Sequence, residues 1–224
     1  MLRFISPERP MHKQTMAATT DILGLQAHLP RNAWPVVYNW LRRNPVQVRI
    51  SPPRTTKLGD YRVATRTLHH RISVNSDLNR YAFLVVLIHE FAHYTTFQKY
   101  RRHEPHGAEW KAEYKRLMRP FLTREVFPAD VLRMLILHLN DAPSSSCTDH
   151  GLMRVLRRYD REPRPFLEEL EPNTVFRFNQ KLFVKGPQLR KRFRCRCLNN
   201  RRIYLIDPTA EVQLDQPLAA RRAS

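Results

Sequence analysis

The run His-Glu-Phe-Ala-His at residues 89–93 is the part of this sequence best suited to chemistry. On a helix, residues four positions apart lie on the same face, so His89 and His93 can bind one metal ion. Neutral imidazoles and an open coordination position let zinc lower the pKa of a bound water to about 7. Glu90 would take the proton of that water and later give it to a leaving amine. This pattern predicts a zinc site that activates water for attack on a peptide carbonyl.

The residues before this run indicate that the motif is buried. The stretch from Tyr81 to Ile88 is the longest unbroken apolar run in the chain. Burying polar side chains beside it is costly unless each of them has a partner. A metal ion would be such a partner. The alternative is that the three polar residues are satisfied by hydrogen bonds inside the core.

A catalytic zinc site needs a third protein ligand. Candidates downstream of the motif are His103, Glu104, His106 and Glu109. We choose His106, because it lies in a short loop before a new helix, where Gly107 would let the backbone approach the metal. His103 is the alternative, although it follows two arginines and is more typical of a solvated turn. We expect Glu104 and Glu109 to lie at the surface or behind the ligands.

Hydrophobic periodicity and turn residues predict the elements that position these groups. Helices are expected at 16–29, 32–43, 77–98, 107–120, 128–140 and 150–159. Strands are expected at 46–50, 60–65 and 68–75, before the helix that carries the motif. The strand near 70–75 could hold an extended substrate by edge pairing, as peptide-binding sheets do.

A shift in composition after Pro163 predicts a second part of the chain. Short β-type runs follow at 175–178, 182–184, 192–198 and 203–206. Residues 176–206 contain ten Lys and Arg residues and no acidic residue. We therefore expect a small basic β module.

The charge of the chain favours a polyanionic partner. Its 224 residues include 39 Lys and Arg against 20 Asp and Glu, a net charge of +19, and nucleic acid is the usual polyanion for such a surface. DNA-contacting candidates in the β module are Arg190, Lys191, Arg192, Arg194 and Arg196, with Phe193 or Tyr204 stacking on bases. The alternative is a solvated charged face that carries Arg192, Arg194 and Arg196, opposite an inward face that carries Phe193, Cys195 and Cys197.

Other features limit the class of protein. No apolar run approaches the roughly 20 residues that span a bilayer, and the N-terminus lacks a secretion signal. Cys147, Cys195 and Cys197 cannot form a complete disulfide set, which favours a reducing cytoplasm.

Four segments, in this order, resemble the SprT-like family, and especially its short bacterial members. They are 54–62 (RTTKLGDYR), 70–75 (HRISVN), 89–93 (HEFAH) and 106–111 (HGAEWK), and the resemblance extends over most of 20–160. It implies that His89, His93 and His106 hold zinc and that Glu90 is the general base. It also implies a DNA-dependent metalloprotease that degrades proteins crosslinked to DNA, in the bacterial cytoplasm or nucleoid. The 54–62 stretch would then either bind DNA near the site or brace the sheet.

The end of the chain departs from the zinc ribbon that often ends members of this family. Phe176-Arg177-Phe178 occupies the place of a first cysteine pair, and one residue instead of two separates Cys195 from Cys197. Four thiolates are therefore not available for a structural zinc. We interpret 174–214 as a ribbon remnant without metal, in which aromatic side chains form the core. A cysteine site shared between two chains is the alternative.

The sequence predicts an α+β fold. A zincin-like helical domain with a small three-stranded sheet is expected at 16–160, a degenerate zinc-ribbon-like β module at 161–214, and flexible tails at 1–15 and 215–224. The predicted function is that of a zinc metallopeptidase with one catalytic zinc, with DNA and DNA-bound proteins as partners and no membrane. The alternatives are a non-catalytic zinc protein that binds DNA and has a regulatory role, and a metalloprotease that acts on a protein or small peptide without nucleic acid.

Overall fold

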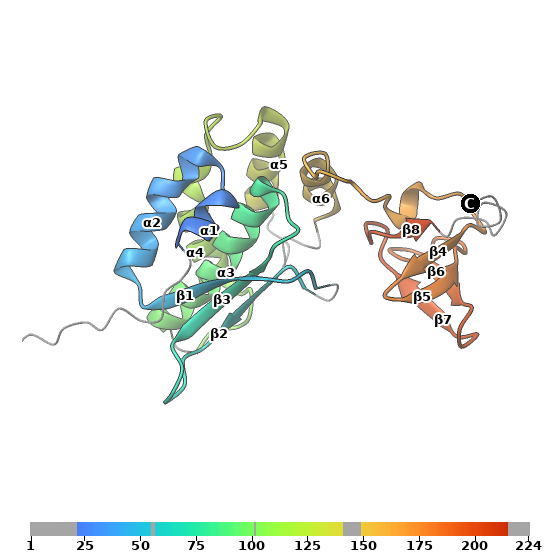
Figure 1. The fold of residues 1–224 in the computed structure, drawn as a ribbon, viewed down its shortest axis with the longest axis horizontal. Coiled ribbons are helices and arrows are strands. Elements are labelled where there is room, and N and C mark those ends of the chain that lie inside the picture. Colours follow the sequence, from blue (N-terminus) through green and yellow to red (C-terminus); the bar gives the residue numbers. More distant parts are fainter. Residues whose placement is uncertain (1–21, 55–56, 101, 141–148, 215–224) are drawn as a thin grey trace, which may run out of the picture.

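The computed structural model of the protein describes residues 22–54, 57–100, 102–140 and 149–214. The expected tails, the start of the helix expected at 16–29, and Cys147 lie outside these ranges. The fold is mixed α+β, with a three-stranded sheet and a separate five-stranded sheet. In Figure 1 the helices gather around α3, with the three-stranded sheet along one side of it.

The helices agree with those expected from the sequence. They are α1 (Ile22–Ala27), α2 (Trp34–Arg43), α3 (Arg80–Tyr100), α4 (Ala108–Met118), α5 (Ala129–Asn140) and α6 (His150–Arg157), with short 3-10 turns η1 (Arg31–Ala33), η2 (Arg119–Phe121) and η4 (Leu167–Glu169). Asn79 caps α3, because its side-chain oxygen accepts hydrogen bonds from the N–H groups of Tyr81 and Ala82, both at 3.0 Å. Among the described residues, no helix combines the length and apolar character that a membrane crossing requires.

The three-stranded sheet consists of β1 (Val46–Ser51), β2 (Gly59–Arg62) and β3 (His70–Asn75), in the order β1-β3-β2. Strand β3 is parallel to β1 and antiparallel to β2. Our expectation that the strand near 70–75 offers a free edge is therefore wrong, since β3 is paired on both sides. The edge strands are β1 and β2, and β2 is the one that continues directly into β3.

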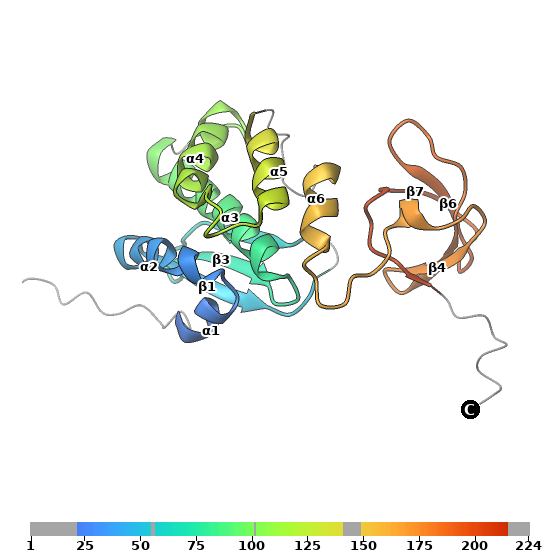
Figure 2. The same cartoon turned by 90° about the horizontal axis from the view of Figure 1, so that it is seen from above.

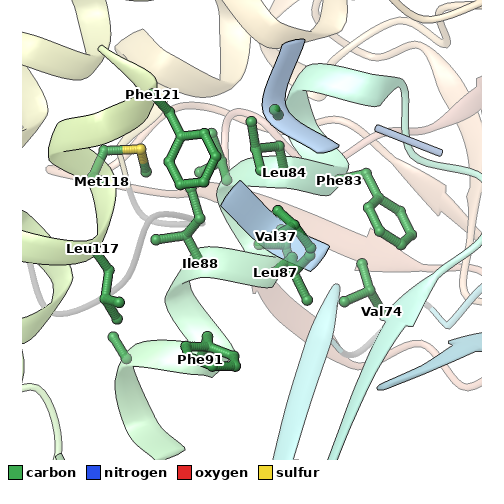
Figure 3. Close-up of a cluster of buried hydrophobic side chains, with 14 of the residues drawn as sticks. Val37, Val74, Phe83, Leu84, Leu87, Ile88, Phe91, Leu117, Met118 and Phe121 are labelled. Carbon is green, nitrogen blue, oxygen red and sulfur yellow. The ribbon is translucent and has the colours of Figure 1, made fainter. Parts of the chain in front are cut away.

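Helix α3 is the centre of the main hydrophobic core. Its apolar side chains are buried around most of its circumference, as expected for a helix with neighbours on all sides. Figure 3 shows this core, in which Leu84, Leu87 and Ile88 of α3 cluster with Val37 of α2 and Val74 of β3. The chemistry-bearing run at 89–93 thus begins inside a packed core, which fixes its backbone.

The C-terminal sheet consists of β4 (Val175–Phe178), β5 (Lys181–Val184), β6 (Phe193–Cys197), β7 (Ile203–Ile206) and β8 (Gln213–Leu214), in the order β7-β6-β5-β4-β8. It has its own core, in which Phe176, Cys195 and Cys197 are fully buried. The predicted inward face of β6 is confirmed, since Phe193, Cys195 and Cys197 alternate with exposed arginines. The two-residue strand β8 was not expected.

Helix α6 connects the two cores. Arg154 Nε lies 2.7 Å from Glu168 Oε1, and Arg157 Nη1 lies 2.9 Å from Glu169 Oε2. The Arg157 guanidinium also lies 3.9 Å from the centre of the Phe166 ring. Figures 1 and 2 both show the five-stranded sheet set apart from α1–α5, with α6 between them. The domain boundary at 160/161 stays a prediction.

Candidate metal centre

Three histidine side chains converge at one point of the helical part. The Nε2–Nε2 distances are 3.3 Å for His89–His93, 3.1 Å for His93–His106 and 3.2 Å for His89–His106. Each nitrogen carries either a hydrogen or a lone pair, so the three cannot all hydrogen-bond to one another. Tetrahedral zinc with bonds of 2.0–2.1 Å would place its ligand nitrogens about 3.3 Å apart. The group therefore has the spacing of a three-histidine metal site.

Two of these histidines come from α3 and the third from the turn before α4. His89 and His93 are one helical turn apart, as the spacing predicted. The N–H of Gly107 donates to the carbonyl of Glu104 at 2.9 Å, which closes a turn with Pro105 at its second position. His106, at the third position, has a φ of 58°, in the left-handed region that usually holds glycine.

Gly107 has a different role from the one we expected. A Cβ atom at Gly107 would lie 3.0 Å from both the Cβ and the carbonyl oxygen of Glu104, so the nearest atoms belong to the turn itself. The unusual backbone conformation belongs to His106 and not to the glycine. The Pro105-His106 order could have indicated this, since proline favours the second position of a turn whose third residue has a positive φ.

Trp110 packs against all three imidazoles. Its ring centre lies 4.7 Å from that of His89, 5.3 Å from that of His93 and 4.6 Å from that of His106. Tyr114 stacks on Trp110, with ring centres 5.0 Å apart, and its ring centre lies 5.9 Å from that of His89. Trp110 also belongs to the main hydrophobic core, so its contact with the imidazoles is a second role, which our sequence analysis did not predict. Its place four residues after His106, one turn into α4, was the available signal for this second role.

The protein environment favours neutral imidazoles, the form that binds metal. Burial, followed by the neighbouring histidines, lowers the pKa of His89 to about 2. Burial, followed by His106 and His103, lowers the pKa of His93 to about 4. Burial and then Lys111 hold the pKa of His106 below its usual value.

Glu90 is buried beside the edge strand β2. Burial raises the pKa of its carboxyl group to about 8, and the charge of Asp60 adds to this. Lys57, Arg54 and a hydrogen bond from the backbone N–H of Tyr61 act in the opposite direction. Burial and the charge of Asp60 outweigh these effects, so the environment as a whole favours the protonated carboxyl group, which suits a group that exchanges protons.

Arg54 and Lys57, two described residues of the 54–62 stretch, brace the sheet. Arg54 Nε donates to Asn75 Oδ1 at 2.8 Å, and Arg54 Nη1 donates to Ser73 Oγ at 3.1 Å. The Asn75 amide in turn donates to the carbonyl oxygens of Arg54, at 3.0 Å, and of Lys57, at 3.1 Å. Lys57 is also 2.8 Å from Asp60. We had two alternatives for this stretch, DNA binding near the site and bracing of the sheet, and these contacts favour bracing.

The other candidate ligands lie outside the histidine group. His103 is not a member of it, and its buried Nδ1 has no hydrogen-bond partner among the residues that the structure describes. Glu104 is exposed and Glu109 is half-buried. Our choice of His106 over His103 agrees with this geometry.

The five basic residues assigned to DNA contact are all exposed. Arg194 and Arg196 lie on the outer face of β6, whereas 190–192 precede the strand. Phe193 is 7% exposed and faces inward, so our expectation that it stacks on bases is wrong. Tyr204 is half-buried and borders a groove of about 430 Å³, together with Phe178, Lys181 and Arg192.

One basic residue of the β module is structural. Lys185 is buried, and its ammonium group donates to the carbonyl oxygens of Glu168, at 3.1 Å, and of Leu170. It also lies 4.4 Å from the centre of the Phe193 ring. The positive charge of this module therefore does not lie entirely on its surface, since Lys185 contributes to it from the interior.

A mixed α+β fold with three converging histidines on and after a buried helix defines a candidate metalloprotein. Residues 33–131 match the model of the SprT-like family, and this segment contains all three histidines and Glu90. The resemblance noted from the sequence is confirmed over this segment, which is similar to the SprT-like family. No curated protein and no solved structure matches the chain.

Proposed function

We propose that the protein is a zinc-dependent metalloprotease of SprT-like type that acts on DNA-bound or crosslinked proteins. The observation that carries this proposal is the triangle of His89, His93 and His106 nitrogens, 3.1–3.3 Å apart. The buried carboxyl of the next residue, Glu90, supports an enzyme over a non-catalytic zinc protein. A protein that only bound zinc and DNA would have no use for it.

The residues present fit this chemistry. Zinc, when bound by the three imidazoles, would supply a Lewis acid that acidifies water and polarises a peptide carbonyl. Glu90 would accept a proton and return it to the leaving amine nitrogen. Its buried position keeps bulk water from exchanging that proton first. Trp110 would hold the imidazole rings in place and shield one side of the group.

The substrate strand would pair with β2 in place of β3. Among the described residues, strand β2 pairs only with β3, and Gly59 of β2 approaches Glu90 so closely that a Cβ atom there would lie 2.6 Å from Oε1. An extended peptide added to the free edge of β2 would therefore pass beside the proton-exchanging group.

The β module would supply the attraction to DNA. The stretch 176–206 contributes ten of the 39 basic residues and no acidic residue. Arg194 and Arg196 are exposed together on one side of β6, and phosphate binding needs only such accessible cations.

Cleavage of a DNA-bound test protein by the zinc-loaded protein tests the proposal. The wild type and Glu90→Gln are compared with and without DNA, and zinc content is measured in both. We expect cleavage by the wild type in the presence of DNA and none by Glu90→Gln at equal zinc content. Cleavage that Glu90→Gln retains would overturn the mechanism. Cleavage that is independent of DNA would favour a metalloprotease without a nucleic-acid partner.

A further inference from the structure

One face of the five-stranded sheet carries exposed aliphatic and arginine side chains next to each other. The register of β6 and β7 pairs Arg194 with Leu205 and Arg196 with Ile203. Directly paired residues on neighbouring antiparallel strands point to the same face of the sheet. Both arginines are exposed, and Ile203 and Leu205 are 47% and 52% exposed. This part of the sheet is therefore both apolar and cationic.

The same face continues over β5 and β4. Val184 of β5 is paired with Arg196, and Val175 of β4 is paired with Val184. Val175 is exposed and Val184 is half-buried. The stretch 176–206 contains no acidic residue that could neutralise the arginines from within the module's strands. We call this surface the outer face, and define it by Val175, Val184, Arg194, Arg196, Ile203 and Leu205.

The composition of the outer face indicates an anionic partner. Aliphatic side chains that are exposed together, rather than singly, typically mark a binding surface. The arginines between them favour a partner of negative charge. A second copy of this chain does not fit, because it would bring the arginines of the two faces together.

The aromatic side chains of the module lie on the opposite side of the sheet. Tyr204 is paired with the buried Cys195, and Phe178 shares its face of β4 with the buried Phe176. Both aromatic residues border the groove of about 430 Å³ described above. Single-stranded nucleic acid is typically bound by stacking its bases on aromatic side chains. None of the six residues of the outer face is aromatic, so this face suits a duplex, whose bases stay stacked on one another.

The pattern of the outer face fits the minor groove of a duplex. Arg194 and Arg196 are two residues apart on one strand, about 6.6 Å, so each can reach its own phosphate. Aliphatic side chains cannot read the hydrogen-bonding groups of the major groove, whereas proteins that bind the minor groove commonly place Leu or Ile in it.

We propose that the outer face binds double-stranded DNA from the minor-groove side. Arg194 and Arg196 contact phosphates, and Ile203 and Leu205 contact sugars and base edges. This inference rests on the proposed function for the choice of DNA as the polyanion. It does not depend on proteolysis, so binding measurements test it separately from cleavage.

Fluorescence anisotropy of a labelled A·T-rich duplex with the zinc-loaded, full-length protein tests the aliphatic contacts. The double variant Ile203→Gln, Leu205→Gln removes them and leaves every charge in place. The matched control is Ile136→Gln, Leu137→Gln, because these two residues of α5 are similarly exposed, at 45% and 56%. We expect about tenfold weaker binding by the first variant, an unchanged dependence on salt, and wild-type binding by the control.

Two measurements on the wild type decide the question even if the variant does not fold. The duplex should bind more tightly than either separated strand, and netropsin, a small ligand that fills the minor groove, should displace the protein. Tighter binding of a single strand would overturn the proposal and place DNA in the groove beside Tyr204, and failure of netropsin to compete would overturn it as well.

Unchanged duplex affinity of the folded Ile203→Gln, Leu205→Gln variant would also overturn the proposal. The outer face would then serve another anionic partner, such as an acidic protein segment. A wild type that binds no DNA would contradict both this proposal and the DNA partner of the proposed function. Duplex binding of the expected kind by a protein that cleaves nothing would support this proposal and contradict the proposed function alone.

Discussion

A Cβ atom on Gly59 would lie 2.6 Å from Oε1 of Glu90. It would also lie 2.6 Å from Cγ1 of Val86, a buried residue one turn earlier on α3. The edge strand and the helix that carries His89 and His93 thus approach so closely that only glycine fits between them. This contact fixes the distance between strand β2 and the Glu90 carboxyl group.

Replacing Gly59 by alanine should therefore damage both the fold and the site. Val86 cannot move away in a packed core, so we expect a loss of about 1–3 kcal/mol in the free energy of unfolding, as for other overpacked sites. We also expect a lower kcat, because Glu90 would be displaced. Gly151→Ala is the control, since its Cβ would meet the flexible end of Met134, at 2.7 Å. Wild-type stability and activity in Gly59→Ala would contradict the close approach.

The left-handed backbone of His106 predicts that glycine and alanine at this position differ in their effect on stability, although both remove the metal ligand. His106→Gly and His106→Ala should both lose zinc affinity, since each removes one ligand. Without metal, the glycine variant should be more stable than the alanine variant by about 1 kcal/mol, because only glycine adopts a φ of 58° without strain. Chemical denaturation in chelator measures the difference. Equal stability of the two apo variants would show that the turn relaxes in solution.

The buried carboxyl of Glu113 should make stability depend on pH. It accepts a hydrogen bond from Arg116 Nη2 at 2.8 Å and another from Lys99, and so joins α4 to α3. Burial alone would raise its pKa, but these two cations outweigh burial and hold the pKa below its usual 4.5. The unfolded chain therefore takes up the proton first as the pH falls, and the stabilisation is lost at low pH.

We expect Glu113→Gln to lower the free energy of unfolding by about 1–2 kcal/mol at neutral pH, a range reduced because both cations are about half exposed. The gap to the wild type should be complete above about pH 5 and should close as the pH falls below 4.5. Denaturation of the two metal-free proteins across this range measures it. A gap that stays constant down to pH 3 would contradict the ion pairs.

Arg194 and Arg196 should contribute to the salt dependence of DNA binding. If each contacts one phosphate, replacing both by glutamine reduces the slope of log affinity against log salt by about 2. Arg42 and Arg43, an exposed pair on α2, provide the matched control variant. An equal change in slope for both pairs would mean that only total charge matters. No measurable affinity of the wild type at low salt would remove DNA from the proposed function.

The sequence predicted best those features that depend on residues close together in the chain. The apolar run before His89 and the spacing to His93 predicted a buried helix with two converging imidazoles, and α3 has both. The helices and most strands could be predicted from hydrophobic periodicity, because this pattern depends only on the residues within each element. The choice of His106 depended on loop chemistry close to the helix start.

The features that the sequence did not predict depend on distant contacts. The central position of β3 follows from pairing with β1, 24 residues earlier at Val46–His70, which no local pattern records. The role of Gly59 depends on Glu90, a residue on another element. The inward direction of Phe193 was predicted, but its burial under Lys185 depends on the whole C-terminal sheet.

X-ray absorption at the zinc edge of the purified protein tests the central claim most directly. We predict one zinc per chain, bound by three imidazole nitrogens and one oxygen at about 2.0–2.1 Å, and loss of this spectrum in His106→Ala. Sulfur at about 2.3 Å would place the metal at Cys195 and Cys197 instead. That spectrum, or a chain that binds no zinc, would contradict the assignment of His89, His93 and His106 as the metal centre.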